Sequence, residues 1–499
     1  MALHKKPENT LEQAWSNFVA LGRQHLIWRR PLQSQKSNFY LIGNRNLEIR
    51  DAVRTLEESK EFGLLLKELS KRANSDHSKR CDLSFWKHGV GNYLKRSGFY
   101  LELANEENQD VKITLQKLLE TLEKKTETIT YLAPMEFIYL AKEFIDCSNF
   151  KIQKFSIREL EGLLDKNLNE IFYPYAFLDP GFLSNYWFVM VKETKPISSI
   201  GHITFNLGEV GKVKLEYSPY PSLERALRRL VFYDWRPDYS RGDEIQPGDW
   251  KGWMGFSIPF VLKISDNFLE APLRAPEISK LSTEPYFDPN TGEEELSEGP
   301  EILIRLDNEE TEKLEKTIKK MDELLRTFEA AEAKWPFVFV SLGFLTKAFF
   351  VNGLEQLLWH IASIEALLGE RGNGVTNRLA DRVGNILGGT KEECKSFKKQ
   401  FKEVYDFRSG LVHGREFTDQ IWESHLYHAR DMARRILCWF LNFLRIAQDT
   451  LESTNPHGYL NRQEILAAID LGSTTIKSLS NISGSLPPKF PNNPSWIEP

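Results

Sequence analysis

The sequence predicts an α+β multidomain protein, with a mixed helical and β-rich N-terminal region followed by an all-α helical bundle at the C-terminal end. Three observations support this fold class. The chain has 499 residues, which is enough for more than one domain. Apolar residues recur at helical spacing towards both ends of the chain. Between them lie short segments rich in β-branched and aromatic residues, separated by glycine and proline.

Residues 1–175 are predicted to be mostly helical. One apolar stripe at helical spacing is formed by Leu11, Trp15, Phe18 and Leu21. The segment 112–125 predicts a further helix. Ser156, with Glu159 three residues later, predicts a capping box at the start of another.

Residues 176–306 are predicted to form a β-rich module that could act as a sensor. The expected strands cover 186–192, 202–207, 210–217 and 255–264. Inside this module, the segment 234–256 is dense in Trp, Asp and Gly. It is either a ligand-binding loop or a long loop whose tryptophans close over the edge of a sheet.

The second half of the chain is expected to be helical. An amphipathic connector helix over 307–334 begins at Asn308, which we expect to cap it. A bundle follows over 335–452. Residues 453–499 are rich in Ser, Asn and Pro and are predicted to be a loose tail.

Composition excludes several classes of protein. A net charge of −5 argues against a protein that coats nucleic acid by bulk charge, so an RNA site has to be a local patch. The four cysteines are far apart and form no CxxC, which suggests neither a disulfide framework nor a zinc site. The N-terminus is polar, and the most apolar run, 335–345, is too short to cross a bilayer. We therefore expect a cytoplasmic protein.

The segment 397–414 is the most unusual part of the chain. It predicts a helix, with Thr390 as the N-cap upstream and an apolar arc opposite an arc of lysines. Arg408 projects from the middle of the apolar arc, and Glu365 sits in the centre of an upstream apolar stripe. A charge in such a position is costly unless it is paired. We expect Glu365 and Arg408 to meet in the core or at its rim, either as part of a site or as a structural ion pair.

Three segments of this region resemble a known family. IEALLG (364–369), RLADRV (378–383) and VYDFRSGLVHG (404–414) are similar to the Apea-like branch of the HEPN superfamily. The resemblance covers about residues 335–450 and implies a small all-helical domain whose RNase members carry Arg-x4–6-His. Arg408 and His413 match that spacing. The spacing alone is unspecific, because Arg72 and His77 match it within a polar run.

The resemblance implies a metal-independent endoribonuclease. His413 would serve as acid or base and Arg408 would hold the phosphate, while the ribose 2′-OH attacks. Glu365 would orient Arg408, Ser409 would contact a phosphate oxygen, and Gly414 would let the backbone turn. A local RNA-binding patch, or only a solvated helix face, is formed by Lys398, Lys399, Lys402 and Arg415. No acidic cluster for Mg²⁺ accompanies these residues, so we expect neither a metal nor a cofactor.

The same resemblance implies an anti-phage or toxin role, with tRNA or mRNA as substrate and an unknown trigger bound by the N-terminal region. The resemblance also implies that catalytic members pair two protomers, so that two Arg/His sets share one groove, and we expect a homodimer through the C-terminal domain. A candidate surface is the stripe Ile421, His425, His428, Met432, Trp439 and Phe443, which is otherwise intramolecular core. Two alternatives are open. One is a non-catalytic HEPN adaptor that binds a nucleotide or a protein partner. The other is a ligand-binding protein that depends on Trp250 or Trp253 of the Trp-rich loop.

Overall fold

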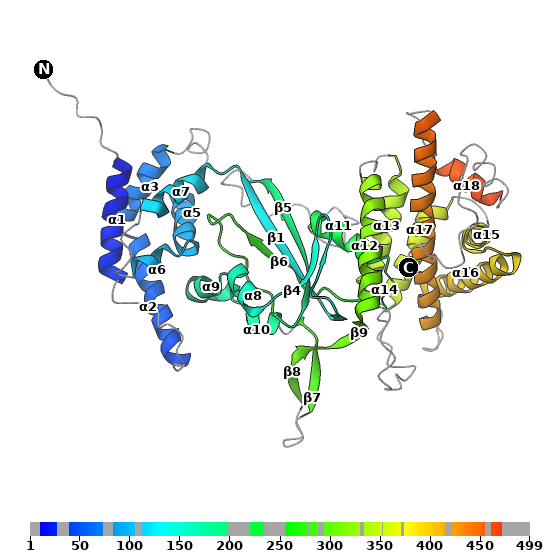
Figure 1. Cartoon of the computed structure of the whole chain (residues 1–499), viewed down its shortest axis with the longest axis horizontal. Coiled ribbons are helices and arrows are strands. Elements are labelled where there is room, and N and C mark those ends of the chain that lie inside the picture. The colour runs from blue at the N-terminus through cyan, green and yellow to red at the C-terminus, as the bar shows by residue number, and fades with distance from the viewer. Residues whose placement is uncertain are drawn as a thin grey trace.

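The computed structural model places a β-sheet between two groups of helices. N-terminal helices lie at one end of the molecule, C-terminal helices at the other, and the sheet lies between them (Figure 1). The structure describes residues 10–26, 39–72, 83–104, 112–197, 220–233, 235, 255–277, 280–287, 294–329, 334–351, 353–370, 374–414, 422–454 and 461–471. All structural statements below concern these residues.

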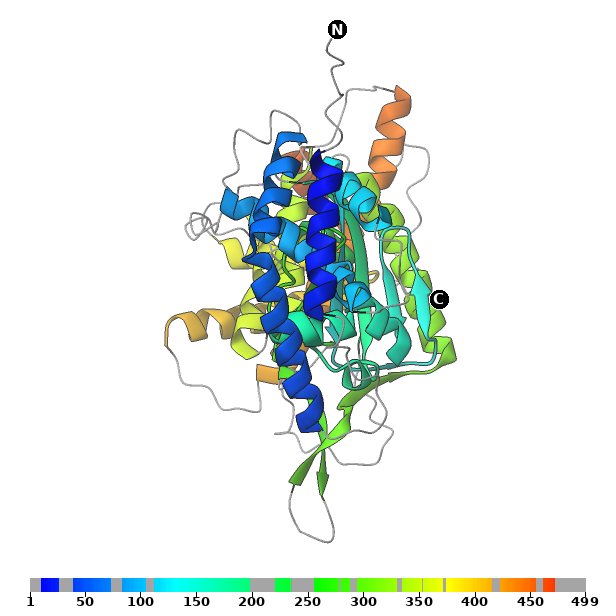
Figure 2. The same cartoon turned by 90° about the vertical axis from the view of Figure 1, so that its left-hand side faces the viewer.

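The N-terminal helices enclose a hydrophobic core of their own. They are α1 (Thr10–Leu26), α2 (Phe39–Glu57), α3 (Lys60–Arg72), α5 (Leu83–Arg96), α6 (Phe99–Leu103) and α7 (Lys112–Glu123). Three residues of the predicted stripe on α1, Leu11, Trp15 and Phe18, are buried in that core, and the fourth, Leu21, packs against it half-buried. Arg96 ties this group to the sheet region, because its guanidinium donates hydrogen bonds to the backbone carbonyls of Ser265 at 2.7 Å and Asn267 at 2.9 Å. Figure 2 shows these helices in front of the sheet.

The main sheet is antiparallel and has the strand order β3-β4-β5-β1-β6. Its strands are β1 (Thr126–Met135), β3 (Phe144–Asp146), β4 (Lys151–Lys154), β5 (Trp187–Pro196) and β6 (Leu262–Ser265). The predicted strand at 186–192 is confirmed as β5, whereas only the end of the predicted strand at 255–264 is a strand. The predicted strands at 202–207 and 210–217 lie outside the described residues.

The sheet begins much earlier in the chain than the sequence suggested. Residues 1–175 were predicted to be mostly helical, yet β1, β3 and β4 all fall between Thr126 and Lys154. Pro134 weakens the strand signal of β1, because proline is poorly tolerated inside a sheet. It is accommodated here because β6 pairs with β1 only as far as Leu132, so that Pro134 has a single neighbouring strand, β5.

Helices cover both faces of the sheet. One face buries Tyr131 and Val189 against α11 (Pro221–Leu230) and α12 (Asn308–Glu329). The other face buries Phe188 beneath α8 (Ile157–Leu163) and α10 (Pro180–Leu183). The predicted capping box of Ser156 and Glu159 is present at the start of α8. The short helix α9 (Lys166–Phe172) packs instead against the N-terminal helices.

Two small β elements connect the sheet to the second half of the chain. β2 (Phe137–Leu140) continues from β1 after a bend at Phe137, whose φ is +67°, and pairs in parallel with β9 (Ile302–Leu306). The hairpin of β7 (Thr283–Phe287) and β8 (Glu294–Pro300) projects away from the body (Figures 1 and 2).

The predicted connector helix is confirmed as α12, but its cap is one residue earlier than expected. The Asp307 carboxylate accepts a hydrogen bond from the Glu310 N–H at 2.9 Å, and the Glu310 carboxylate accepts one from the Asp307 N–H at 3.3 Å. This reciprocal pair satisfies the free N–H groups at the helix start. Asp307, and not Asn308, therefore caps α12.

The C-terminal region is helical, as predicted. It comprises α13 (Pro336–Phe349), α14 (Gly353–Leu368), α15 (Val375–Leu387), α16 (Lys391–Val412), α17 (Trp422–Thr454) and α18 (Arg462–Asp470). These helices share one continuous hydrophobic core with α12 and one face of the sheet.

The predicted loose tail over 453–499 is wrong for residues 461–471. These include α18, which starts at a capping box of Asn461 and Glu464 and buries Ile465 and Ile469 in the core. It is held by Arg382, whose guanidinium bonds to the Asp470 carboxylate at 2.6 Å and 2.7 Å. The polar composition around this short helix gave no sign of it. The residue that holds it, Arg382, lies 88 residues before Asp470 in the sequence.

Candidate functional site at the end of helix α16

Helix α16 places the candidate residues, and local sequence explains where it starts. Thr390 and Glu393 form the capping box at its N-terminus, which confirms Thr390 as the N-cap. Phe401, Val404 and Phe407 bury one side of the helix in the core. The helix then stays regular as far as Val412.

Close packing against α15 fixes the position of α16. A Cβ added at Gly384 would lie 2.7 Å from the backbone oxygen of Cys394, and one added at Gly388 would lie 2.5 Å from the Cys394 backbone nitrogen. Real Cβ atoms do not approach backbone so closely. Only glycine therefore allows the two helices to meet at this distance.

Arg408 and Glu365 lie next to each other at the rim of the core, as the sequence predicted. The guanidinium Nη2 is 3.9 Å from the Glu365 Oε2, and about one third of each side chain is exposed, 32% for Arg408 and 30% for Glu365. The Arg408 Nε is buried, and no group among the described residues accepts a hydrogen bond from it. A single contact at 3.9 Å is a weak ion pair. Arg408 therefore keeps most of its hydrogen-bonding capacity.

Tyr405 completes this cluster and was not foreseen as part of it. Its hydroxyl donates a hydrogen bond of 2.8 Å to the Glu365 Oε1, and its ring lies 5.7 Å from the Arg408 guanidinium carbon. Burial, and then the bond to Glu365, raise the pKa of Tyr405 to about 12. Tyr405 thus holds the carboxylate, and its ring supports the guanidinium through a cation–π contact.

His413 lies at the other side of the helix end. It is the C-cap of α16, is exposed, and its ring has no hydrogen bond or ion pair with the residues that the structure describes. Gly414 follows with φ +74°, a conformation that favours glycine, so it lets the chain turn after the histidine, as predicted. Ser409 is half-buried, and its carbonyl accepts the His413 N–H at 3.1 Å.

Helical geometry separates Arg408 from His413. Five residues at 3.6 per turn place the two side chains about 140° apart around the axis of α16. Arg408 lies on the apolar side that faces α14, whereas His413 lies on the exposed side that carries the lysines. The regular helix therefore does not bring the two residues of one chain into one cleft.

The predicted RNA-binding lysines differ in how much of their charge is free. Lys398 forms an ion pair with Asp381 of α15, and Lys399 lies 3.7 Å from Glu403. Lys402 has no partner among the described residues. Arg415 lies outside them. The free positive charge along this face is thus smaller than the sequence indicates.

The apolar stripe predicted for a dimer interface is mostly internal. Met432, Trp439 and Phe443 are buried in the core of the chain itself, which is the alternative that the sequence left open. His425 contacts Phe407 with ring centroids 4.8 Å apart, so it joins the start of α17 to α16. Ile421 lies outside the described residues.

Within the Trp-rich segment 234–256, the structure describes Trp235, Gly255 and Phe256. Trp235 is fully buried, and its indole N–H donates a hydrogen bond of 2.9 Å to the Leu230 carbonyl. Phe256 packs edge-on against it. Trp235 is therefore a core residue, while Trp250 and Trp253 lie outside the described residues.

Metal-ligand clusters, disulfides and membrane-spanning helices are all absent from the described residues. They contain no group of three His, Cys, Asp or Glu side chains that would suit a metal ion. Their three cysteines, Cys147, Cys394 and Cys438, are free thiols. Within the described ranges, no helix combines the length and apolar character needed to cross a bilayer.

Comparison with known proteins adds no relative. No protein-family model, curated protein or solved structure matches this chain.

Proposed function

We propose that the protein is a metal-independent endoribonuclease of HEPN type that acts in the cytoplasm, in anti-phage defence or as a toxin. The observation that carries the proposal is the state of Arg408. Its guanidinium emerges from an apolar helix face, yet a single carboxylate of the described residues forms an ion pair with it, at 3.9 Å. Such a group is prepared to receive a phosphate, because a guanidinium fork matches two phosphate oxygens.

The chemistry assigns one role to each side chain. A neutral His413 accepts the proton of the ribose 2′-OH, and the 2′-oxygen then attacks the adjacent phosphorus. Arg408 stabilises the charge that develops on the phosphorane oxygens. The P–O5′ bond breaks, and a protonated imidazole returns a proton to the leaving oxygen. The products are a 2′,3′-cyclic phosphate and a 5′-hydroxyl.

The complete site requires two copies of the chain. Arg408 and His413 of one chain lie about 140° apart around α16, so they do not face the same RNA phosphate. Each would act together with the other residue from a second chain. A two-fold pairing of the exposed ends of α16 would set Arg408 of one copy opposite His413 of a second copy. Val412, whose side chain is 58% exposed next to His413, is an apolar contact for such a pairing. Lys402 would then lie beside the RNA backbone.

Cleavage of RNA tests the proposal. Purified protein is incubated with total cellular RNA in the presence of EDTA, for wild type, Arg408→Ala, His413→Ala and a control variant, Lys67→Ala on α3. We expect wild type and the control to cleave, and each site variant to lose activity about 10²-fold or more. Cleavage that survives in both site variants would contradict the proposal.

A second candidate is a non-catalytic HEPN adaptor that binds a nucleotide or a protein partner. The separation of Arg408 from His413 on α16 is the observation that favours it. An adaptor would bind its partner equally well after His413→Ala, and its wild-type form would cleave no RNA.

A further inference from the structure

A large groove lies at the edge of the main sheet, far from α16 in the sequence. It measures about 980 Å³ and runs between α8 and α11, over the turn that joins β3 to β4 and along β5. Binding sites for small molecules are commonly of this size. β4 pairs with β5 only as far as Met190, so the groove opens where β5 continues past the end of its neighbour.

Three basic side chains that line this groove have no ion-pair partner among the described residues. Arg158 of α8, Lys192 of β5 and Arg225 of α11 all line it and are exposed. No hydrogen bond or ion pair of their side chains involves another described residue. They come from three different elements, which the fold brings to one concave surface.

The carboxylates of the same groove are all engaged. Asp146 lies 3.5 Å from Lys151, and Glu159 caps α8. Glu193 accepts a hydrogen bond of 2.8 Å from the Ser222 hydroxyl. Glu329 binds Arg229. Neutral donors leave Glu159 and Glu193 charged, so the groove lining holds five cations (Lys151, Arg158, Lys192, Arg225 and Arg229) against four carboxylates, a net charge of +1.

Apolar side chains line the remaining surface. Phe155, Leu163 and Met190 belong to the core between α8 and the sheet. A site that combines an apolar wall with several converging cations suits an anionic molecule with an apolar body.

We infer that this groove binds a small phosphate-bearing molecule of the size of a mononucleotide. Arg158, Lys192 and Arg225 receive its phosphate groups, and the apolar wall receives its other part. This site is separate from α16, and the inference does not depend on the nuclease activity.

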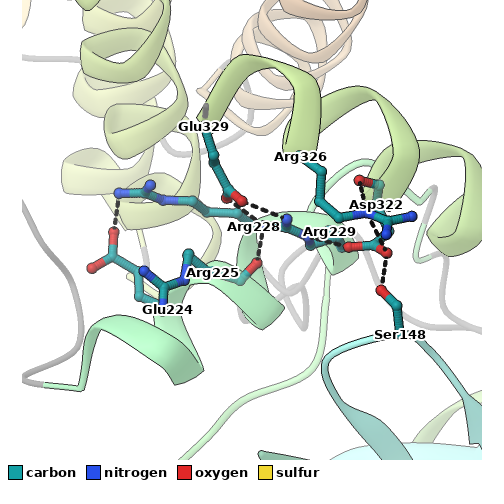
Figure 3. Close-up of polar contacts among 8 residues, drawn as sticks. All are labelled: Ser148, Glu224, Arg225, Arg228, Arg229, Asp322, Arg326 and Glu329. Carbon is teal, nitrogen blue, oxygen red and sulfur yellow. Dashed lines mark hydrogen bonds and ion pairs between the residues drawn. The ribbon is translucent and has the colours of Figure 1, made fainter. Parts of the chain in front are cut away.

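The groove is connected to the C-terminal bundle through Arg229. This buried guanidinium bonds to both oxygens of Glu329, at 2.7 Å and 2.9 Å, and to Asp322 at 3.1 Å. Asp322 also accepts a hydrogen bond from the hydroxyl of Ser148, a residue that lines the groove (Figure 3). Asp322 and Glu329 belong to α12, which packs on α17. A phosphate bound in the groove would compete with Glu329 for Arg229. Binding would therefore change the contacts at the C-terminal end of α12.

Calorimetric titration of the full chain at constant physiological salt tests the inference. The probes are inorganic pyrophosphate, AMP, ADP, GDP and CDP. We expect at least one nucleotide to bind, and to bind more tightly than pyrophosphate. Arg158→Ala and Arg225→Ala are each expected to weaken binding about tenfold or more, because each removes a charged hydrogen bond to phosphate.

Two further variants sharpen the test. Glu329→Gln removes a negative charge from the groove and is expected to tighten binding several-fold, opposite in sign to the arginine variants. Arg54→Ala removes an exposed arginine on α2 and is expected to leave binding unchanged. Thermal melting of each variant confirms that it is folded.

Three results would overturn the inference. The first is that none of the five probes binds at millimolar concentration. The second is that Arg54→Ala weakens binding as much as Arg158→Ala, which indicates a general charge effect. The third is that pyrophosphate binds as tightly as the nucleotides, which removes the role of the apolar wall.

Discussion

Three arginines of the described residues, Arg229, Arg382 and Arg408, lie against apolar helix faces and differ in their partners. Arg229 and Arg382 are almost fully buried, and each binds two carboxylates with short hydrogen bonds. Arg408 has one carboxylate at 3.9 Å and a buried Nε without an acceptor among the described residues. The first two arginines hold helices together, whereas Arg408 retains the capacity to bind a ligand.

Replacing Arg382 tests whether this arginine holds helices together. Arg382→Ala leaves Asp470 without its cation, leaves Glu370 with only the more distant Arg378, and opens the contact with α18, so we expect the free energy of unfolding to fall by about 3–5 kcal/mol. Denaturant unfolding followed by circular dichroism measures it. Arg378→Ala is the matched control, since that side chain is half exposed and lies 3.5 Å from Glu370. A loss as large in the control as in Arg382→Ala would contradict the assignment.

His360 predicts a dependence of stability on pH. It is fully buried on α14, and burial, followed by the nearby charge of Arg430, lowers its pKa to about 3. Between that value and its ordinary pKa near 6.5, the unfolded state binds more protons than the folded state. Stability is therefore full above about pH 6.5 and is lost as the pH falls towards 3, by up to about 1.4 kcal/mol per pH unit.

Unfolding of wild type and His360→Leu at several pH values between 7.5 and 5 checks this prediction. The variant lacks the titrating ring, so the stability of wild type relative to the variant should decrease as the pH falls below 6.5. A difference between the two proteins that is the same at every pH would show that His360 is not the group responsible.

Residue-level prediction from the sequence succeeded where the signal was local. Glu365 and Arg408 each interrupted an apolar stripe, and two opposite charges in that situation were expected to meet. The ion pair between Arg382 and Asp470 could not be predicted, because Asp470 lies in a polar region 88 residues away. Tyr405 looked like one more core residue of its stripe, and nothing in the sequence revealed its hydrogen bond to Glu365.

Elements with their own start signals were predictable in the same way. The helices that begin at Ser156 and Thr390 carry capping boxes in the sequence, and both were found. β1 was missed because its hydrogen bonds go to β5 and β6, at least 50 residues away, and because Pro134 disguises it. The groove could not be predicted from the sequence, since its lining comes from six elements: β3, β4, β5, α8, α11 and α12.

The contact between α15 and α16 provides a test at the scale of elements. Gly384→Ala would push a methyl group into the Cys394 carbonyl, so we expect a loss of about 1–3 kcal/mol in the free energy of unfolding and reduced RNA cleavage. Gly63→Ala is the matched control, because nothing lies within 4 Å of its added Cβ on α3. That control should gain up to about 1 kcal/mol from helix propensity. Equal losses in both variants would contradict the account.

The described residues form three hydrophobic cores: one links a face of the sheet to the C-terminal bundle, a second belongs to the N-terminal helices, and a third lies under α8 and α10 on the other face of the sheet. The sequence suggested a separate β-rich module and bundle joined by a connector. Instead, α12 buries one broad face that contacts α11, β9 and α17, and so joins the two parts into one packed body. The groove and α16 are therefore connected by contiguous packing, which is a structural requirement for any coupling between them.

The most direct test of the proposed active site is complementation between two inactive subunits. Arg408→Ala and His413→Ala chains are co-expressed with different affinity tags, and the mixed dimer is isolated by both tags in turn. If each site takes Arg408 from one copy and His413 from the other, the mixed dimer holds one intact site and one doubly altered site. We predict about half of the wild-type rate of RNA cleavage per dimer, while each variant alone is inactive. A mixed dimer that is as inactive as its parents would contradict a site shared between copies.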